Sequence, residues 1–138
     1  MTKKTHIAVG VAVTLPLIIE VPIAFWGLLA SIMPDLSQRF IKRKSLTHSA
    51  VFLILTTSLV AIINLNIAIV WCINYMLHIF LDCFTTEGIQ FFYPNKKKYG
   101  VRIIEGKKKD DIFIGNCAMA VIFIILIVGY WSNKNSKI

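Results

Sequence analysis

The sequence predicts an all-α integral membrane protein, a helical bundle built as a single domain of residues 1–138. The chain is 57% hydrophobic and only 16% charged, and its mean hydropathy is +0.70. A soluble domain of this length would need far more charge on its surface. The apolar residues also gather into about four blocks, at residues 7–33, 47–63, 67–84 and 112–131. Composition and blocks together indicate helices that lie in a bilayer.

Two prolines interrupt the first block, residues 7–33, and leave two interpretations of it. It is one long span kinked at Pro16 and Pro22, since proline breaks the helical hydrogen-bond ladder. Alternatively it is a helical hairpin whose limbs, residues 7–15 and 23–32, fold back at the prolines. At about 1.5 Å per residue, neither limb alone crosses a hydrocarbon core about 30 Å thick.

The remaining blocks predict a helical pair and a separate span. Block 47–63 is barely long enough to cross a bilayer, and Asn64-Leu65-Asn66 predicts a tight turn from it into block 67–84. Block 112–131 has the length of a span, and its end at Tyr130-Trp131 suits a membrane interface.

A basic polar loop, residues 85–111, precedes the last block, and its segment 99–104 could pair as short strands. The formal net charge is +8. The basic clusters are Lys3-Lys4, Arg39 with Lys42-Arg43-Lys44, Lys96-Lys97-Lys98 and Lys107-Lys108-Lys109. Such clusters mark cytoplasmic loops and attract anionic lipid headgroups. No nucleic-acid recognition motif accompanies them, so we expect the bilayer and its anionic headgroups as partners and no nucleic acid. The oligomeric state is left open.

All three histidines lie where an apolar block meets a polar segment. The short turn between the second and third blocks brings His48, at the start of one, to the same membrane face as His78 and Asp82, near the end of the other. Asp35 precedes the second block on that face. His6 joins them only if the first block is a hairpin, which the positive-inside rule favours because the early basic clusters then share the cytoplasmic side.

This set of side chains suits a metal ion. His78 and Asp82 are four residues apart, so they emerge on one helix face. Imidazole and carboxylate ligands suit zinc, manganese or iron without selecting among them. Thr47 could cap the helix or hold His48 through a hydrogen bond. The simpler interpretation, an ion pair on a solvated face, is weakened by the cost of ionisable groups close to hydrocarbon.

Several short motifs resemble the YdjM-like family, the LexA-regulated, membrane-bound, metal-dependent hydrolases. They are Thr5-His6, Met33-Pro34-Asp35, Ser45-Leu46-Thr47-His48-Ser49, and Leu77-His78-Ile79-Phe80-Leu81-Asp82 followed by Thr85-Thr86-Glu87-Gly88-Ile89. Their order and spacing cover roughly residues 5 to 95. The resemblance implies a metal-dependent hydrolase site and a distant kinship with zinc-dependent phospholipase C enzymes.

The resemblance also implies roles for individual residues. The candidate metal ligands are His6, Asp35, His48, His78 and Asp82, and the last four are the candidate catalytic residues. Zinc is the first expectation for the ion. Two departures stand out: Ser37 occupies a position that is commonly acidic in the family, and Arg43-Lys44 stand where His-Arg is usual. Arg43 and Lys44 are better suited to grip a phosphate than to bind a metal.

The favoured hypothesis is hydrolysis of a phosphoester in a lipid or lipid-linked substrate, on the cytoplasmic face of a bacterial cytoplasmic membrane. Its main rival is a small non-catalytic membrane protein with a structural metal or polar site, related to stress or phage. A weaker rival is an ion transporter that uses Glu20. Glu87 and Asp110-Asp111 are further carboxylates, interpreted as part of a solvated loop.

Overall fold

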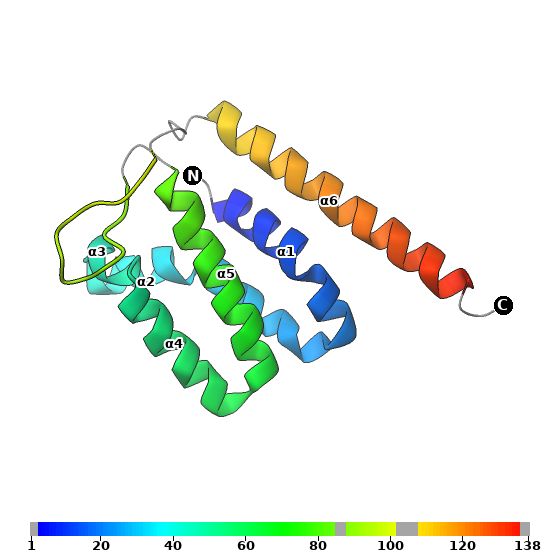
Figure 1. The fold of residues 1–138 in the computed structure, drawn as a ribbon, viewed down its shortest axis with the longest axis horizontal. Helices are drawn as coiled ribbons and strands as arrows, with labels where there is room; N and C mark the ends of the chain where they lie inside the picture. Colours follow the sequence, from blue (N-terminus) through cyan, green and yellow to red (C-terminus); the bar gives the residue numbers. More distant parts are fainter. Residues whose placement is uncertain (1–2, 85–87, 102–107, 136–138) are drawn as a thin grey trace.

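The computed structural model describes residues 3–84, 88–101 and 108–135, and within them it is all-α without a sheet. The elements are α1 (Lys3–Glu20), the 3₁₀ helix η1 (Pro22–Ser31), α2 (Met33–Ile41), α3 (Lys44–Thr47), α4 (Ala50–Ile63), α5 (Leu65–Cys83) and α6 (Lys108–Asn135). Figure 1 shows α5 at the centre of the bundle. The predicted fold class is confirmed.

The first apolar block is a hairpin, because the chain reverses at Val21 and η1 packs back along α1. The reversal comes later than the sequence indicated, since α1 continues through Pro16 to Glu20. The helix continues through Pro16 with one backbone hydrogen bond fewer, and Pro16 is exposed. Pro22 lies in the first turn of η1, where its missing N–H is not needed.

The 3₁₀ form of η1 follows from a row of small residues. Ala24, Gly27 and Ala30 are buried and spaced by three, and a 3₁₀ helix has three residues per turn. The three therefore lie in one line, which packs against α5. A Cβ on Gly27 would lie 2.7 Å from the backbone nitrogen of Trp71, so the two backbones are in direct contact. Such close approach through small residues is typical of membrane helices.

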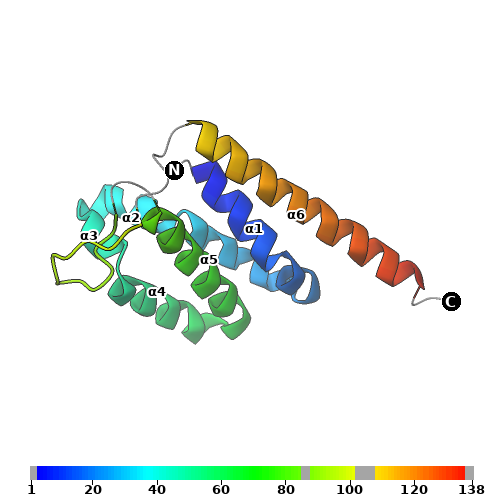
Figure 2. The same ribbon diagram turned by 45° about the horizontal axis from the view of Figure 1, so that its top comes forward.

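The second and third blocks form the expected antiparallel pair, α4 and α5. Asn64 lies between them and caps α5, with its side-chain oxygen accepting from the backbone nitrogens of Asn66 at 2.9 Å and Ile67 at 3.2 Å. The start of α4 and the end of α5 therefore share one end of the bundle, and the start of α1 lies beside the end of α5 in both views (Figures 1 and 2).

Two described helices are long and apolar enough to cross a membrane, α5 and the stretch 109–133 of α6. The apolar helices η1 and α4 are shorter. Among the described helices α6 packs only on α1, and most of its large apolar side chains are exposed. Figure 2 shows it running alongside α1 at the edge of the bundle.

The described part of the polar loop, residues 88–101, forms one isolated antiparallel bridge between Ile89 and Tyr99. The predicted short strands are otherwise not formed there, and residues 102–104 lie outside the described part. The loop is tied to the bundle at two points. The Phe91 carbonyl accepts from the Ala50 nitrogen at 3.0 Å, and the Val101 nitrogen donates to the Cys83 carbonyl at 3.0 Å.

We expect Gly27→Ala to destabilise the protein by about 1–3 kcal/mol, because the added methyl group must push η1 away from α5. Thermal unfolding in detergent measures the change. Gly115→Ala is the matched control, since a Cβ there meets open space. An equal loss of stability in both variants would contradict the proposed contact.

Candidate metal centre

The five candidate ligands come from four parts of the chain and meet at one end of the bundle. His6 is in the first turns of α1, Asp35 begins α2, His48 lies between α3 and α4, and His78 and Asp82 are near the end of α5. The structure brings all five together. His6 is included because the first block is a hairpin.

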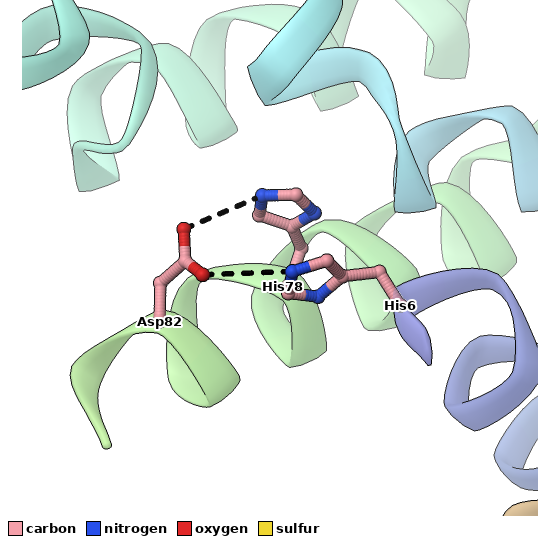
Figure 3. A group of neighbouring side chains, drawn as sticks. All are labelled: His6, His78 and Asp82. Atoms are coloured by element: carbon pink, nitrogen blue, oxygen red, sulfur yellow. Dashed lines mark ion pairs between the residues drawn. The ribbon is translucent and has the colours of Figure 1, made fainter. Parts of the chain in front are cut away.

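Asp82 lies at the centre of the group. Its Oδ1 is 3.5 Å from His6 Nε2, and its Oδ2 is 3.2 Å from His48 Nε2 and 3.6 Å from His78 Nε2. Figure 3 shows the rings of His6 and His78, each joined to a different oxygen of Asp82. The two rings stack with centroids 3.9 Å apart. The predicted i, i+4 pair of His78 and Asp82 therefore does share a helix face.

Asp35 closes the group from the other side. Its Oδ1 is 3.7 Å from both His48 Nε2 and His78 Nε2. Ligand atoms bound to zinc at about 2.0–2.1 Å in a tetrahedron lie about 3.4 Å from one another. The four measured distances between the carboxylate oxygens and these two nitrogens, 3.2–3.7 Å, are close to that value.

The position of the proton on the His78 ring follows from the hydrogen bond of its Nδ1 atom. Nδ1 lies 2.6 Å from the Ser31 carbonyl. A carbonyl only accepts, so Nδ1 carries the hydrogen and the neutral ring presents the lone pair of Nε2 to the carboxylates. Nε2 is buried without a hydrogen-bond partner among the residues that the structure describes.

His48 is held in the same way. Its Nδ1 lies 3.1 Å from Thr47 Oγ1, and that hydroxyl lies within donating distance of the Lys44 carbonyl at 3.3 Å. When the hydroxyl donates to this carbonyl, it accepts from Nδ1–H, and the lone pair of the neutral ring is then on Nε2. Tyr75 donates from its hydroxyl to the Thr47 carbonyl at 2.6 Å and steadies the turn. Ser49, not Thr47, caps α4, so Thr47 fills the second of its two predicted roles.

Neutral imidazoles held in this way are better suited to binding a cation than to contacting one another. His48 Nε2 and His78 Nε2 lie beside the carboxylates of Asp35 and Asp82, and both nitrogens are buried without a hydrogen-bond partner among the residues that the structure describes. Buried polar atoms without partners are rare in folded proteins and call for an explanation. A divalent metal ion satisfies them, and hydrogen bonds from Nδ1 to a carbonyl or hydroxyl are the usual support of metal-binding histidines. The residues present fit such an ion.

Protonation of the imidazoles is the alternative to a bound metal ion, and the pKa shifts of His48 and Asp35 favour it. Burial alone would lower the pKa of His48, but the neighbouring carboxylates of Asp35 and Asp82 outweigh burial and raise it. Burial likewise opposes the charged form of Asp35, yet His48 and His78 outweigh burial and lower the pKa of Asp35. Protons and a metal ion therefore compete for the same nitrogen.

Two further predicted residues, Arg43 and Lys44, have exposed side chains. Their backbone carbonyls lie within hydrogen-bond distance of the Thr47 hydroxyl, next to the candidate ligand His48. Ser37 is buried in α2. Glu87 lies outside the described residues.

The solvated-loop interpretation is wrong for Asp111. This residue is buried in the first turn of α6, where its Oδ1 accepts from the Thr5 hydroxyl at 3.2 Å. Sequence reasoning missed the contact because the two residues are far apart in the chain. Since Thr5 precedes His6, the contact ties α6 to the first turns of α1, next to a candidate ligand.

Comparisons with known proteins show the family. The family model described as YdjM inner membrane protein matches residues 1–136, nearly the whole chain. The chain therefore belongs to the YdjM inner membrane protein family. Neither a curated protein nor a solved structure matches it.

We expect the purified protein to bind a divalent ion and His48→Ala or Asp82→Asn to weaken that binding at least about tenfold, because each removes a donor atom that other residues cannot replace. Elemental analysis after equilibration with zinc, manganese or iron measures the content. Asp110→Asn removes a carboxylate outside the group and serves as the control. Equal metal content in all variants would rule out this site.

The metal-free protein should lose stability as the pH rises above the ordinary histidine pKa of about 6.5. A raised pKa in the folded state means that protonated His48 stabilises the fold fully below about 6.5. This contribution disappears as the pH rises through the folded-state pKa. Thermal unfolding in the presence of a chelator measures the slope. His48→Gln should flatten it, and an unchanged slope in this variant would contradict the assignment.

Proposed function

We propose that this member of the YdjM inner membrane protein family is a membrane-bound, metal-dependent hydrolase that cleaves a phosphoester of a lipid or lipid-linked substrate. One observation carries the proposal: His48 Nε2 and His78 Nε2 both lie 3.2–3.7 Å from the carboxylate oxygens of Asp35 and Asp82. A bound divalent ion would lower the pKa of a water molecule and polarise a phosphoryl oxygen.

We assign different roles to the two histidines and two aspartates according to the exposure of their side chains. The side chains of His48 and His78 are 1% and 0% exposed, whereas that of Asp35 is 28% exposed. Asp35 therefore marks the side from which a substrate reaches the group. On that side Asp35 can accept the proton of the attacking water, while Asp82, more deeply placed, orients the imidazoles.

The number of donors bears on the identity of the ion. A catalytic site keeps a position open for water or substrate. His6 forms a separate triad with His78 and Asp82. When the other four candidate ligands, His48, His78, Asp35 and Asp82, bind one ion, that position exists only on an ion with more than four ligands. Manganese and iron commonly accept more than four, and zinc expands to five in some enzymes. The donor set therefore supports an ion of higher coordination number at least as well as zinc.

The surface around Asp35 supports a lipid substrate. On α2 the side chains of Leu36 and Phe40 are exposed, Phe40 by 80%. The exposed basic residues that follow are Arg39, Lys42, Arg43 and Lys44. A short helix with apolar and basic side chains suits the boundary between headgroups and acyl chains. We assign Arg43 and Lys44 to the anionic headgroup of the substrate.

The same charges support the cytoplasmic face of the bacterial inner membrane as the location of the site. Lys96, Lys97 and Lys98 are exposed on the loop that is tied to the start of α4 and the end of α5, at the end of the bundle that carries the metal centre. They add to the attraction for anionic lipids.

A structural metal site is the second candidate, because four protein donors also resemble the closed sites in which metals only stabilise a fold. Ser37 stands at the position that is commonly acidic in the family. The group therefore has one carboxylate fewer than the family pattern. The transporter hypothesis has less support, since Glu20 is exposed at the α1–η1 turn, beside Asn66 at the other end of the bundle.

The enzyme should release phosphate or a phosphorylated headgroup from vesicles of mixed anionic phospholipids. Phosphorus NMR follows the products after reconstitution with zinc, manganese or iron. His78→Ala should abolish turnover together with metal binding, because a ligand is lost. Arg43→Gln with Lys44→Gln should raise KM about tenfold or more while leaving the metal content unchanged, because only headgroup contacts are lost.

A chelator provides the decisive control. Turnover that survives complete removal of the ion would contradict the metal mechanism. Stoichiometric metal without turnover on any phospholipid would favour the structural site.

A further inference from the structure

A buried polar network lies inside the bundle, next to the metal centre. Thr14, Ser31 and Asn74 are almost fully buried in an otherwise apolar interior. Ser31 donates from Oγ to Asn74 Oδ1 at 2.8 Å, and Asn74 donates from Nδ2 to Thr14 Oγ1 at 3.3 Å and to the Val70 carbonyl at 2.9 Å. Both polar atoms of the Asn74 amide are therefore used.

The local sequence makes room for this network. Thr14 donates to the Gly10 carbonyl at 2.7 Å. A Cβ on Gly10 would collide with the Asn74 amide and lie 2.5 Å from Ser31 Oγ. Burying three polar side chains among apolar helices is costly unless every group is paired. A fully paired set at this position indicates a role beyond filling space.

The network and the metal centre share one residue, Ser31. This last residue of η1 is held at its side chain by Asn74 and at its carbonyl by His78 Nδ1, 2.6 Å away. Asn74 and His78 are four residues apart, so they lie on one face of α5 and grip the same residue of η1. The position of Asn74 therefore determines where the Ser31 carbonyl lies relative to His78.

We propose that Asn74 and Ser31 are positioning residues for the metal centre. They hold the Ser31 carbonyl against His78 Nδ1, so that the ring stays in the Nδ1–H form and its Nε2 lone pair faces Asp35 and Asp82. Neither side chain touches the metal ion. The benefit for metal binding rests on the proposed function, whereas the form of the His78 ring does not.

Nitrogen NMR of the metal-free protein labelled in its histidines tests the inference directly. At about pH 8, above the ordinary histidine pKa of about 6.5, the spectrum distinguishes the two neutral forms of the ring. We expect His78 in the wild type to be in the Nδ1–H form. Ser31→Ala and Asn74→Leu should each populate the Nε2–H form. Both should weaken zinc binding, measured by isothermal titration calorimetry, by about tenfold or more.

Thr56→Val is the matched control. Thr56 is another buried hydroxyl between helices, which donates to the Phe52 carbonyl at 2.9 Å and accepts from the Trp71 indole at 3.4 Å. None of these bonds reaches Ser31 or His78, so the ring form and the zinc affinity should stay as in the wild type.

The inference is overturned if folded Ser31→Ala protein keeps both the wild-type ring form and the wild-type zinc affinity, or if wild-type His78 is in the Nε2–H form. Should Asn74→Leu fail to fold, Ser31→Ala decides, because it removes one hydroxyl and keeps the backbone. If the wild type binds no metal while the ring form still changes in the variants, the positioning role stands and the proposed hydrolase fails.

Discussion

The candidate metal centre depends on the close contact between η1 and α5. Gly27 leaves no side chain where the two backbones meet, and Ala24 and Ala30 keep the same line of η1 narrow. Because η1 lies so close, its last residue reaches His78, and the helix that follows carries Asp35 to the same place. The reversal before η1 also returns α1 to that end of the bundle, beside Asp82. The row of small residues on η1 thus brings candidate ligands that are far apart in the sequence to one end of the bundle.

The sequence predicted which histidines and carboxylates lie together, partly from local rules and partly from the family resemblance. His78 and Asp82 share a face through their spacing of four, and the short turn at Asn64 sets the ends of α4 and α5. Charge asymmetry between loops favoured the hairpin that the first block forms. The positions of the blocks were also close, with α5 beginning two residues before the expected block.

The remaining features depend on contacts that no local pattern encodes. A proline within α1 looked like a break, but the helix continues through it to Glu20 with one backbone hydrogen bond fewer. The proton positions on His48 and His78 depend on Thr47 and on the Ser31 carbonyl. Asp111 reaches Thr5 from the other end of the chain, so its burial could be found only in the folded structure.

The asymmetry of the centre bears on whether it is catalytic or structural. A closed structural site gains nothing from an exposed ligand, since solvent at one side only helps protons to displace the ion. Here the two imidazoles are fully buried, whereas Asp35 is partly exposed, on a helix with apolar and basic side chains at its surface. The imidazoles are held by hydrogen bonds at their Nδ1 atoms, and the partly exposed Asp35 lies on the side that would suit lipid headgroups. This arrangement supports the proposed hydrolase over the structural site.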